Sequence, residues 1–417
     1  MKDQKSSLWL FVAALSGLLV FLSLSCGLAA IVLSGSASAS EAMSFIVFAS
    51  SSLVTLGLFG ALLVVAIRGR LGKISPPLEP GRGWLLLAAL WVILAVVALL
   101  LPASWQSSMA VVPFHVMLVV LPGLILFLFA VQAAGRGVNL TVRHSITSMV
   151  AGALALVPAL PLELVGLLLS SAVVAFLAVA FPGGSVELER LITLFQRWST
   201  TAPTSINPEE ILSLLASPVV LGVLALTLAV VVPIVEEISK TLLLPLLGYF
   251  KRPQPLLALL WGAACGLGFA LVEGVSNGGL GLGTPASWLL GVVARIPATA
   301  MHALSSGLIG LGWGYYWQGR RRWILPLAYL GAIIYHGLWN FNTVGILGGG
   351  ALLTEMSSST SMMAGGVLLI LALGILGVLM LLAPTALIAI PLILRRRSGS
   401  SSAAEGEERI RREQLTS

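Results

Sequence analysis

Residues 218–249 read PVVLGVLALTLAVVVPIVEEISKTLLLPLLGY. The run exceeds the roughly 20 apolar residues that a transmembrane helix needs, so it predicts a membrane span. Glu236, Glu237 and Lys240 nevertheless lie inside it. Because a bilayer offers no water to solvate ions, ionisable side chains within a span are costly and mark a functional site by default. This one stretch therefore predicts both the fold class and the place of the site.

The composition places the whole chain in the same class. Of its 417 residues, 58% are hydrophobic and 9% charged, and the mean hydropathy is +1.03. A soluble domain carries about 25% charged residues, so we expect an integral membrane protein in contact with the lipid bilayer. The net charge of +7 comes from basic residues in short clusters between apolar runs, as the positive-inside rule requires, and we exclude nucleic acid as a partner.

The apolar runs predict an all-α, polytopic transmembrane helix bundle. Its ten expected spans are 8–33, 42–67, 83–101, 109–134, 147–181, 218–249, 255–277, 286–317, 323–346 and 365–394. The fifth run is long and contains Pro158, Pro161 and Glu163, which predicts either a kinked helix or two pieces. Cys26 and Cys265 both lie within spans and form neither a metal-ligand spacing nor a disulfide framework.

Loop charges predict the orientation of the spans. Basic clusters follow the second, fourth, sixth, eighth and tenth spans, whereas the intervening loops are neutral or acidic. This alternation places both termini in the cytoplasm. The segment Ala37-Ser38-Ala39 is similar to a signal-peptidase site, but the preceding apolar run is longer than the roughly 7–15 residues of a cleavable signal. We therefore expect the first span to be retained in a multi-pass protein of a prokaryotic plasma membrane.

The same patterns divide the chain into five regions. These are an N-terminal region of five spans (1–181), an extracytoplasmic amphipathic loop (182–217), a four-span catalytic core (218–346), an outer loop with the last span (347–397) and a Ser-rich, disordered cytoplasmic tail (398–417). Within the loop, apolar residues recur at helical spacing from Leu188 to Trp198, which predicts a helix lying in the membrane interface. Asn207 followed by Pro208 predicts the start of a second helix.

The first motif pairs acidic and basic residues on one helix. Glu236 and Lys240 are four residues apart and share a helix face, while Glu237 lies about 100° further round. One reading is a buried ion pair that fixes helix packing. The other makes Glu236 or Glu237 a general base that activates water, with Lys240 compensating its charge. Two carboxylates against one lysine favour the second reading.

Three further side chains suggest a metal site. Glu273 ends an apolar motif in the seventh span, and His302 and His336 lie near the middle of the eighth and ninth. A lone buried histidine is usually a satisfied core residue, but two on adjacent spans near glutamates reverse that expectation. Imidazole and carboxylate are ligands of catalytic zinc, so Glu273, His302 and His336 are candidate Zn²⁺ ligands. Asn340 would orient an imidazole or donate to an oxyanion.

The acidic residues of the sixth and seventh spans are expected at different depths in the membrane. Glu273 lies toward the outer end of its span, whereas the two glutamates of the sixth span lie in the inner half of theirs. A glutamate–histidine pair could also activate water without zinc. Arg295, inside the eighth span, is a candidate partner for a buried carboxylate, and His115 and His144 are expected to be structural or surface residues.

At these residues the sequence resembles the PrsW family of intramembrane proteases, part of a wider superfamily with the type II CAAX prenyl endopeptidases. The EExxK motif matches 236–240, the FxxxE motif matches 269–273, and the later motifs match His302 and His336 with Asn340. Glu273 stands where the prenyl endopeptidases typically carry histidine, so the PrsW family is the closer match. The resemblance covers 218–343 and implies hydrolysis of a peptide bond in a membrane-anchored protein substrate.

Two other classes of function are compatible with the same ionisable residues. Intramembrane glutamate, lysine and histidine also serve proton relays, so an ion-coupled transporter is one alternative. Transporters often show paired repeats with broken helices in both halves, whereas the ionisable groups here concentrate in the second half. A non-catalytic membrane scaffold that has inherited the site is the other alternative.

Overall fold

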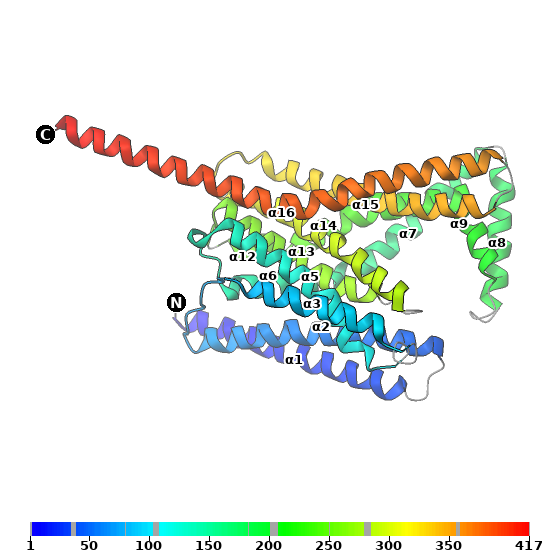
Figure 1. Ribbon diagram of the computed structural model, residues 1–417, viewed down its shortest axis with the longest axis horizontal. Helices are drawn as coiled ribbons and strands as arrows, with labels where there is room; N and C mark the ends of the chain where they lie inside the picture. Colours follow the sequence, from blue (N-terminus) through cyan, green and yellow to red (C-terminus); the bar gives the residue numbers. More distant parts are fainter. Residues whose placement is uncertain are drawn as a thin grey trace. The chain divides into compact units, whose positions relative to one another are not determined.

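The computed structural model describes residues 2–34, 39–79, 81–102, 108–181, 183–200, 207–249, 251–278, 285–355 and 359–416. Among these residues the elements are helices joined by short connections, with no β-strand (Figure 1). Ten helical segments are long and apolar enough to cross a membrane. The predicted all-α, ten-span architecture is therefore confirmed. The cytoplasmic placement of the termini, the retention of the first span and the five-region division stay predictions.

The chain folds into two compact units, and the first comprises Met1–Leu156, Lys240–Tyr329 and Ala383–Ser417. Its principal helices are α1 (Lys2–Ser34), α2 (Ala39–Arg70), α3 (Gly83–Leu100), α5 (Val111–Ala134), η1 (Arg136–Val138), α6 (Val142–Leu154), α12 (Leu244–Gly248), α13 (Pro255–Gly278) and α14 (Pro285–Trp317). Figure 1 shows α1 and α2 side by side, as their contacts require. Helix α13 packs against α14, α6, α5 and α2, and so forms the centre of this unit.

Glycines let the neighbours of α13 approach its backbone closely. A Cβ atom on Gly152 of α6 would lie 1.8 Å from the Cys265 carbonyl oxygen, and one on Gly266 of α13 would lie 2.1 Å from that of His302. Only residues without a side chain fit such crossings, which are typical of packed membrane helices. The contact at Gly266 also sets the position of α14 at His302.

The second unit comprises Val157–Ser239 and Leu330–Leu382. It contains nearly all of α7 (Leu156–Val179), α8 (Gly184–Thr200), α9 (Pro208–Ala216), α10 (Pro218–Leu226), the π-helical turn η3 (Thr227–Val231), most of α11 (Val232–Thr241) and parts of α15 (Ile324–Glu355) and α16 (Ser359–Thr416). The boundary between the units falls within α11, between Ser239 and Lys240. Helix α11 thus belongs to both units, as do α7, α15 and α16.

The long fifth run forms two helices, the second of the two forms that its prolines predicted. Helices α6 and α7 are interrupted at Ala155. Pro158 has no N–H to donate to the carbonyl of Leu154, and its ring clashes with that carbonyl, so the regular hydrogen-bond ladder cannot continue there. The two pieces together still make one candidate span, Val142–Val179.

The predicted loop at 182–217 contains the two expected helices, α8 and α9. Asn207 caps α9, because its side-chain oxygen accepts a hydrogen bond of 3.0 Å from the backbone N–H of Glu209. On α8, Leu191 and Leu194 are buried. An Arg190–Glu187 ion pair of 2.8 Å lies on the same helix and lowers the pKa of the Glu187 carboxyl.

Helix α16 extends into the predicted cytoplasmic tail, whose disorder stays a prediction. Helix α16 continues to Thr416, through the stretch whose serines predicted a disordered tail. The physical reason is local, since the last part of this stretch is rich in Glu, Arg and Gln, which are good helix formers. Glu407 and Glu408 also stand four residues before Arg411 and Arg412, a spacing that supports a helix.

The close approach at Gly266 can be tested by a single methyl group. We expect Gly266→Ala to destabilise the protein by about 1–3 kcal/mol, because backbone must shift to admit the Cβ. Gly60→Ala in α2 is the matched control, since nothing lies within 4 Å of its added Cβ. Thermal unfolding in detergent measures both variants. Equal melting temperatures for Gly266→Ala and Gly60→Ala would contradict the packing at α13.

Candidate metal and catalytic site

One group of ionisable side chains lies in the second unit, where α11 meets α15. Glu236, Glu237 and His336 are 6%, 0% and 2% exposed. The His336 ring stands between the two carboxylates, with Nδ1 2.9 Å from Glu237 Oε1 and Nε2 3.8 Å from Glu236 Oε2. We call these three residues the α11–α15 group. It brings both carboxylates of the EExxK motif to one of the predicted histidines.

The two carboxylates contact His336 in different ways. The 2.9 Å contact to Glu237 is a hydrogen bond, and a carboxylate can only accept, so a neutral His336 carries its proton on Nδ1. Its Nε2 lone pair then faces Glu236 Oε2 across 3.8 Å, which is too long for a direct hydrogen bond. Two ligand atoms of a tetrahedral zinc ion lie roughly 3.4 Å apart, so a small adjustment would admit a metal ion there.

The α11–α15 group has the composition of a metal site. One potential ligand atom from each of Glu236, Glu237 and His336 lies within 4.8 Å of the others. Two buried carboxylates beside one imidazole also need a cation to balance their charge. These residues can therefore hold a metal ion.

Asn340 fixes the place where α15 meets the turn η3. In η3 the N–H of Val232 bonds to the carbonyl of Thr227, five residues back rather than four. The Leu228 carbonyl thereby loses its usual donor, and Pro233, the next residue, has no N–H to offer. Asn340 Nδ2 donates to Leu228 O at 2.8 Å and satisfies it.

This contact sets the register of His336. Asn340 lies one helical turn after His336, so anchoring its amide at η3 places the imidazole beside α11. Gly337 allows the approach, because a Cβ there would lie 2.5 Å from the Ala229 carbonyl oxygen. The observed partner of Asn340 is thus a backbone carbonyl; the oxyanion role stays a prediction. In the sequence, the signal for this contact is Pro233 together with a later asparagine. A single sequence does not show that the two residues meet.

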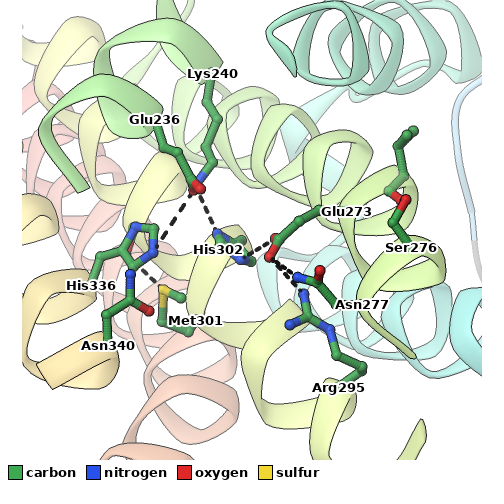
Figure 2. A network of polar contacts seen from close by, with 12 residues as sticks. Glu236, Lys240, Glu273, Ser276, Asn277, Arg295, Met301, His302, His336 and Asn340 are labelled. Atoms are coloured by element: carbon green, nitrogen blue, oxygen red, sulfur yellow. Dashed lines mark hydrogen bonds and ion pairs between the residues drawn. The ribbon is translucent and has the colours of Figure 1, made fainter. Parts of the chain in front are cut away.

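A second group of ionisable side chains lies in the first unit. His302 Nε2 is 2.8 Å from Glu273 Oε2, and Lys240 Nζ is 2.7 Å from His302 Nδ1. Figure 2 shows the Glu273 carboxylate between His302 on one side and Arg295 with Asn277 on the other. Arg295 Nη2 is 3.2 Å and Asn277 Nδ2 2.8 Å from Glu273 Oε1. We call these five residues the α13–α14 group.

The spacing of the FxxxE motif is explained by the contacts of its two residues in this group. Phe269, Glu273 and Asn277 are spaced by four residues and line one face of α13. The Lys240 ammonium lies 4.2 Å from the centre of the Phe269 ring, a cation–π contact. Phe269 therefore holds Lys240 while Glu273, one turn later, holds His302, the partner of Lys240.

The predicted site residues thus fall into two sets. Glu273 and His302 are together in the α13–α14 group, whereas His336 is with Glu236 and Glu237. Arg295 is the partner of a carboxylate, that of the partly buried Glu273. Asn277 was missed, although its spacing from Glu273 is a usable signal. The metal-ligand roles of Glu273, His302 and His336 stay predictions.

The other two histidines contact neither Glu236 nor Glu237 nor Glu273 in the described chain. His115 is buried, with Nε2 2.8 Å from the Val275 carbonyl oxygen and Nδ1 accepting from Trp288 Nε1 at 3.1 Å. Both ring nitrogens are satisfied, so His115 is structural, as predicted. His144 lies at the N-terminus of α6 beside Lys251.

Ten apolar spans with buried glutamates and histidines on consecutive helices define a polytopic membrane protein with the residues of an intramembrane metalloprotease. Residues 141–373 match the model of the PrsW family intramembrane metalloprotease, and the chain belongs to this family. The match extends beyond the 218–343 of the sequence resemblance and takes in α6 to α9. No curated protein and no solved structure matches the chain. The protein is thus a membrane protease.

The role assigned to Asn340 can be tested against its neighbour. We expect Asn340→Ala to cost about 0.5–1.5 kcal/mol in stability, because the partly buried Leu228 carbonyl loses its side-chain donor. Asn342→Ala is the matched control, since Asn342 Nδ2 bonds only to Leu338 O of its own helix. Thermal unfolding and substrate cleavage should both fall for Asn340→Ala and change little for Asn342→Ala.

A double-mutant cycle isolates the carbonyl itself. Pro233→Ala supplies a new N–H next to Leu228 O, so the same Asn340→Ala change should cost less in that background. An identical cost with Pro233 and with Ala at position 233 would show that Asn340 acts through some other contact.

Proposed function

We propose that this protein is a zinc-dependent endopeptidase that cleaves a membrane-anchored protein, with water activated by a glutamate of α11. The α11–α15 group is the observation that carries the proposal. It brings two carboxylates and an imidazole, all buried, from two candidate membrane spans to within ligand distance of one another. Carboxylate and imidazole without thiolate suit a catalytic rather than a structural zinc site.

Within this group we assign Glu236 and His336 as zinc ligands. The contact of Glu237 with Nδ1 leaves Nε2 of His336 as the ligand atom, facing Glu236. Glu237 thus orients the imidazole in the way that carboxylates support metal-bound histidines. Zinc bound there would supply Lewis-acid polarisation of water and of the scissile carbonyl.

Glu237 is the proposed proton carrier. Its Oε1 stays hydrogen-bonded to His336, which fixes the carboxylate, and the second oxygen takes the proton of the attacking water. As the water oxygen bonds to the peptide carbon, the proton passes through Glu237 to the departing nitrogen. The peptide C–N bond then breaks and leaves a carboxylic acid and an amine.

His302 is the proposed third ligand, supplied by the α13–α14 group. Its Nε2 faces the Glu273 carboxylate, so the Nδ1 lone pair is left free to accept, and it accepts from the Lys240 ammonium at 2.7 Å. This lone pair is the one that a zinc ion would take in place of the Lys240 ammonium. Lys240 lies one turn after Glu236 on α11, so the two groups are adjacent in the sequence of this helix.

We assign Glu273 to orient His302 rather than to bind metal. Its oxygens already contact Arg295, Asn277 and His302. A carboxylate held on three sides has little capacity left for an ion, and the second partner of a metal-bound histidine is commonly such a carboxylate.

The substrate must present an unwound peptide. In a transmembrane helix each carbonyl is already hydrogen-bonded, so the segment has to open locally before water can attack. We therefore expect cleavage near a helix end or at a helix-breaking residue of a membrane-anchored protein.

The test compares glutamate variants on a common set of substrates. A library of tagged single-span membrane proteins is produced with the protease, and fragments are identified by mass spectrometry. Glu237→Gln should lower cleavage at least about 100-fold and retain bound zinc, because only the proton acceptor is lost. Glu236→Gln should lose both cleavage and zinc, whereas Glu273→Gln should keep zinc and lower cleavage about 10- to 100-fold.

Glu163→Gln is the control, because Glu163 is an intramembrane glutamate of α7 outside both groups, and it should leave both readouts unchanged. Full cleavage by Glu237→Gln would refute the proton-carrier role. Loss of zinc from Glu273→Gln equal to that from Glu236→Gln would make Glu273 a ligand after all.

A further inference from the structure

A second polar site lies in the first unit, at the ends of three candidate spans. A pocket of about 320 Å³ opens where α2 ends, α6 begins and the connection after α12 starts. The side chains that give it its chemistry are those of Lys73, Ser75, Thr141, Arg143, His144 and Lys251. None of them belongs to the α11–α15 or α13–α14 group.

The pocket concentrates positive charge without a carboxylate. Lys73, Arg143 and Lys251 line it, and no acidic residue is among its described lining. Arg143 is held by neutral groups, with Nη2 3.2 Å from the Lys73 carbonyl oxygen and its guanidinium 4.9 Å from the centre of the Trp9 ring. Burial and the charge of Arg143 lower the pKa of Lys251. Bringing these cations together costs electrostatic free energy, and a bound anion would offset that cost.

Two buried donors in the pocket have no hydrogen-bond partner in the described chain. One is Nε of Arg143, and the other is Nδ1 of His144. His144 Nε2 lies 2.8 Å from Lys251 Nζ, which can only donate when charged, so Nε2 is the acceptor and Nδ1 carries the proton. Unsatisfied buried donors call for an acceptor that the chain does not provide.

The location indicates where that acceptor comes from. The pocket lies next to Arg70, the last residue of one span, and to Val142, the first residue of another. The ends of spans lie at the depth of lipid headgroups, where aromatic residues such as Trp9 are enriched. Basic pockets between spans on the cytoplasmic side are typical of sites for anionic headgroups.

We propose that this pocket binds the phosphate of an anionic phospholipid. Arg143 and Lys251 would contact the phosphate oxygens, His144 would donate to them through Nδ1, and Ser75 and Thr141 would face the headgroup. The lipid would thereby link the end of α2 to the start of α6.

The test uses the full-length protein in a neutral detergent, titrated with phosphatidylglycerol, phosphatidylcholine or inorganic phosphate. Thermal unfolding and native mass spectrometry report binding. Phosphatidylglycerol should raise the melting temperature saturably, and the double variant Arg143→Gln/Lys251→Gln should weaken binding at least about tenfold, since two charged contacts are lost. The control Arg82→Gln/Arg320→Gln removes basic residues outside the pocket and should change binding less than about twofold.

Three results would overturn the proposal. Phosphatidylcholine could raise the melting temperature equally, the control pair could weaken binding as much as the pocket pair, or inorganic phosphate could reproduce the whole effect. The last would make the ligand a free phosphate. Lys73→Gln changes an exposed side chain and should weaken binding without impairing folding, and Lys251→Arg should retain it.

Discussion

Glu236 and Glu237 are adjacent carboxylates buried in a membrane span, and neither keeps its charge there without a compensating cation. Taking one such ion out of water costs several kcal/mol. A protonated His336 supplies one such cation. In the α13–α14 group, the cations Lys240 and Arg295 accompany the single carboxylate of Glu273. Helix α11 carries members of both groups, one turn apart.

The π-helical turn η3, directly before α11, leaves one backbone carbonyl without a donor. The N–H of Val232 bonds to Thr227 rather than to Leu228, and Pro233 has no N–H to replace it. Asn340 then satisfies this carbonyl and fixes α15 at the position where His336 meets Glu237. Single π-helical turns are frequent at functional sites. Here the reason is structural, because the distorted segment lies directly before the EExxK motif and anchors the histidine helix to it.

Hydropathy was sufficient to predict ten helical spans. The cost of buried ions was sufficient to single out six residues of the two groups from the sequence: Glu236, Glu237, Lys240, Glu273, His302 and His336. The partners were not predictable. A spacing of four residues places Glu236 and Lys240 on one face, but it says nothing about which histidine each one meets. Nor does it show that Arg295, from another helix, contacts Glu273.

The most direct test of the proposed zinc ligands is X-ray absorption at the zinc edge of purified, proteolytically active protein. The account predicts nitrogen and oxygen ligands at about 2.0–2.2 Å, no sulfur, and scattering from two imidazoles. In His302→Gln the imidazole contribution should fall to one. Active protein that holds no zinc would contradict the account. So would a single imidazole in the native protein that His302→Gln leaves unchanged, because the α13–α14 group would then supply no ligand.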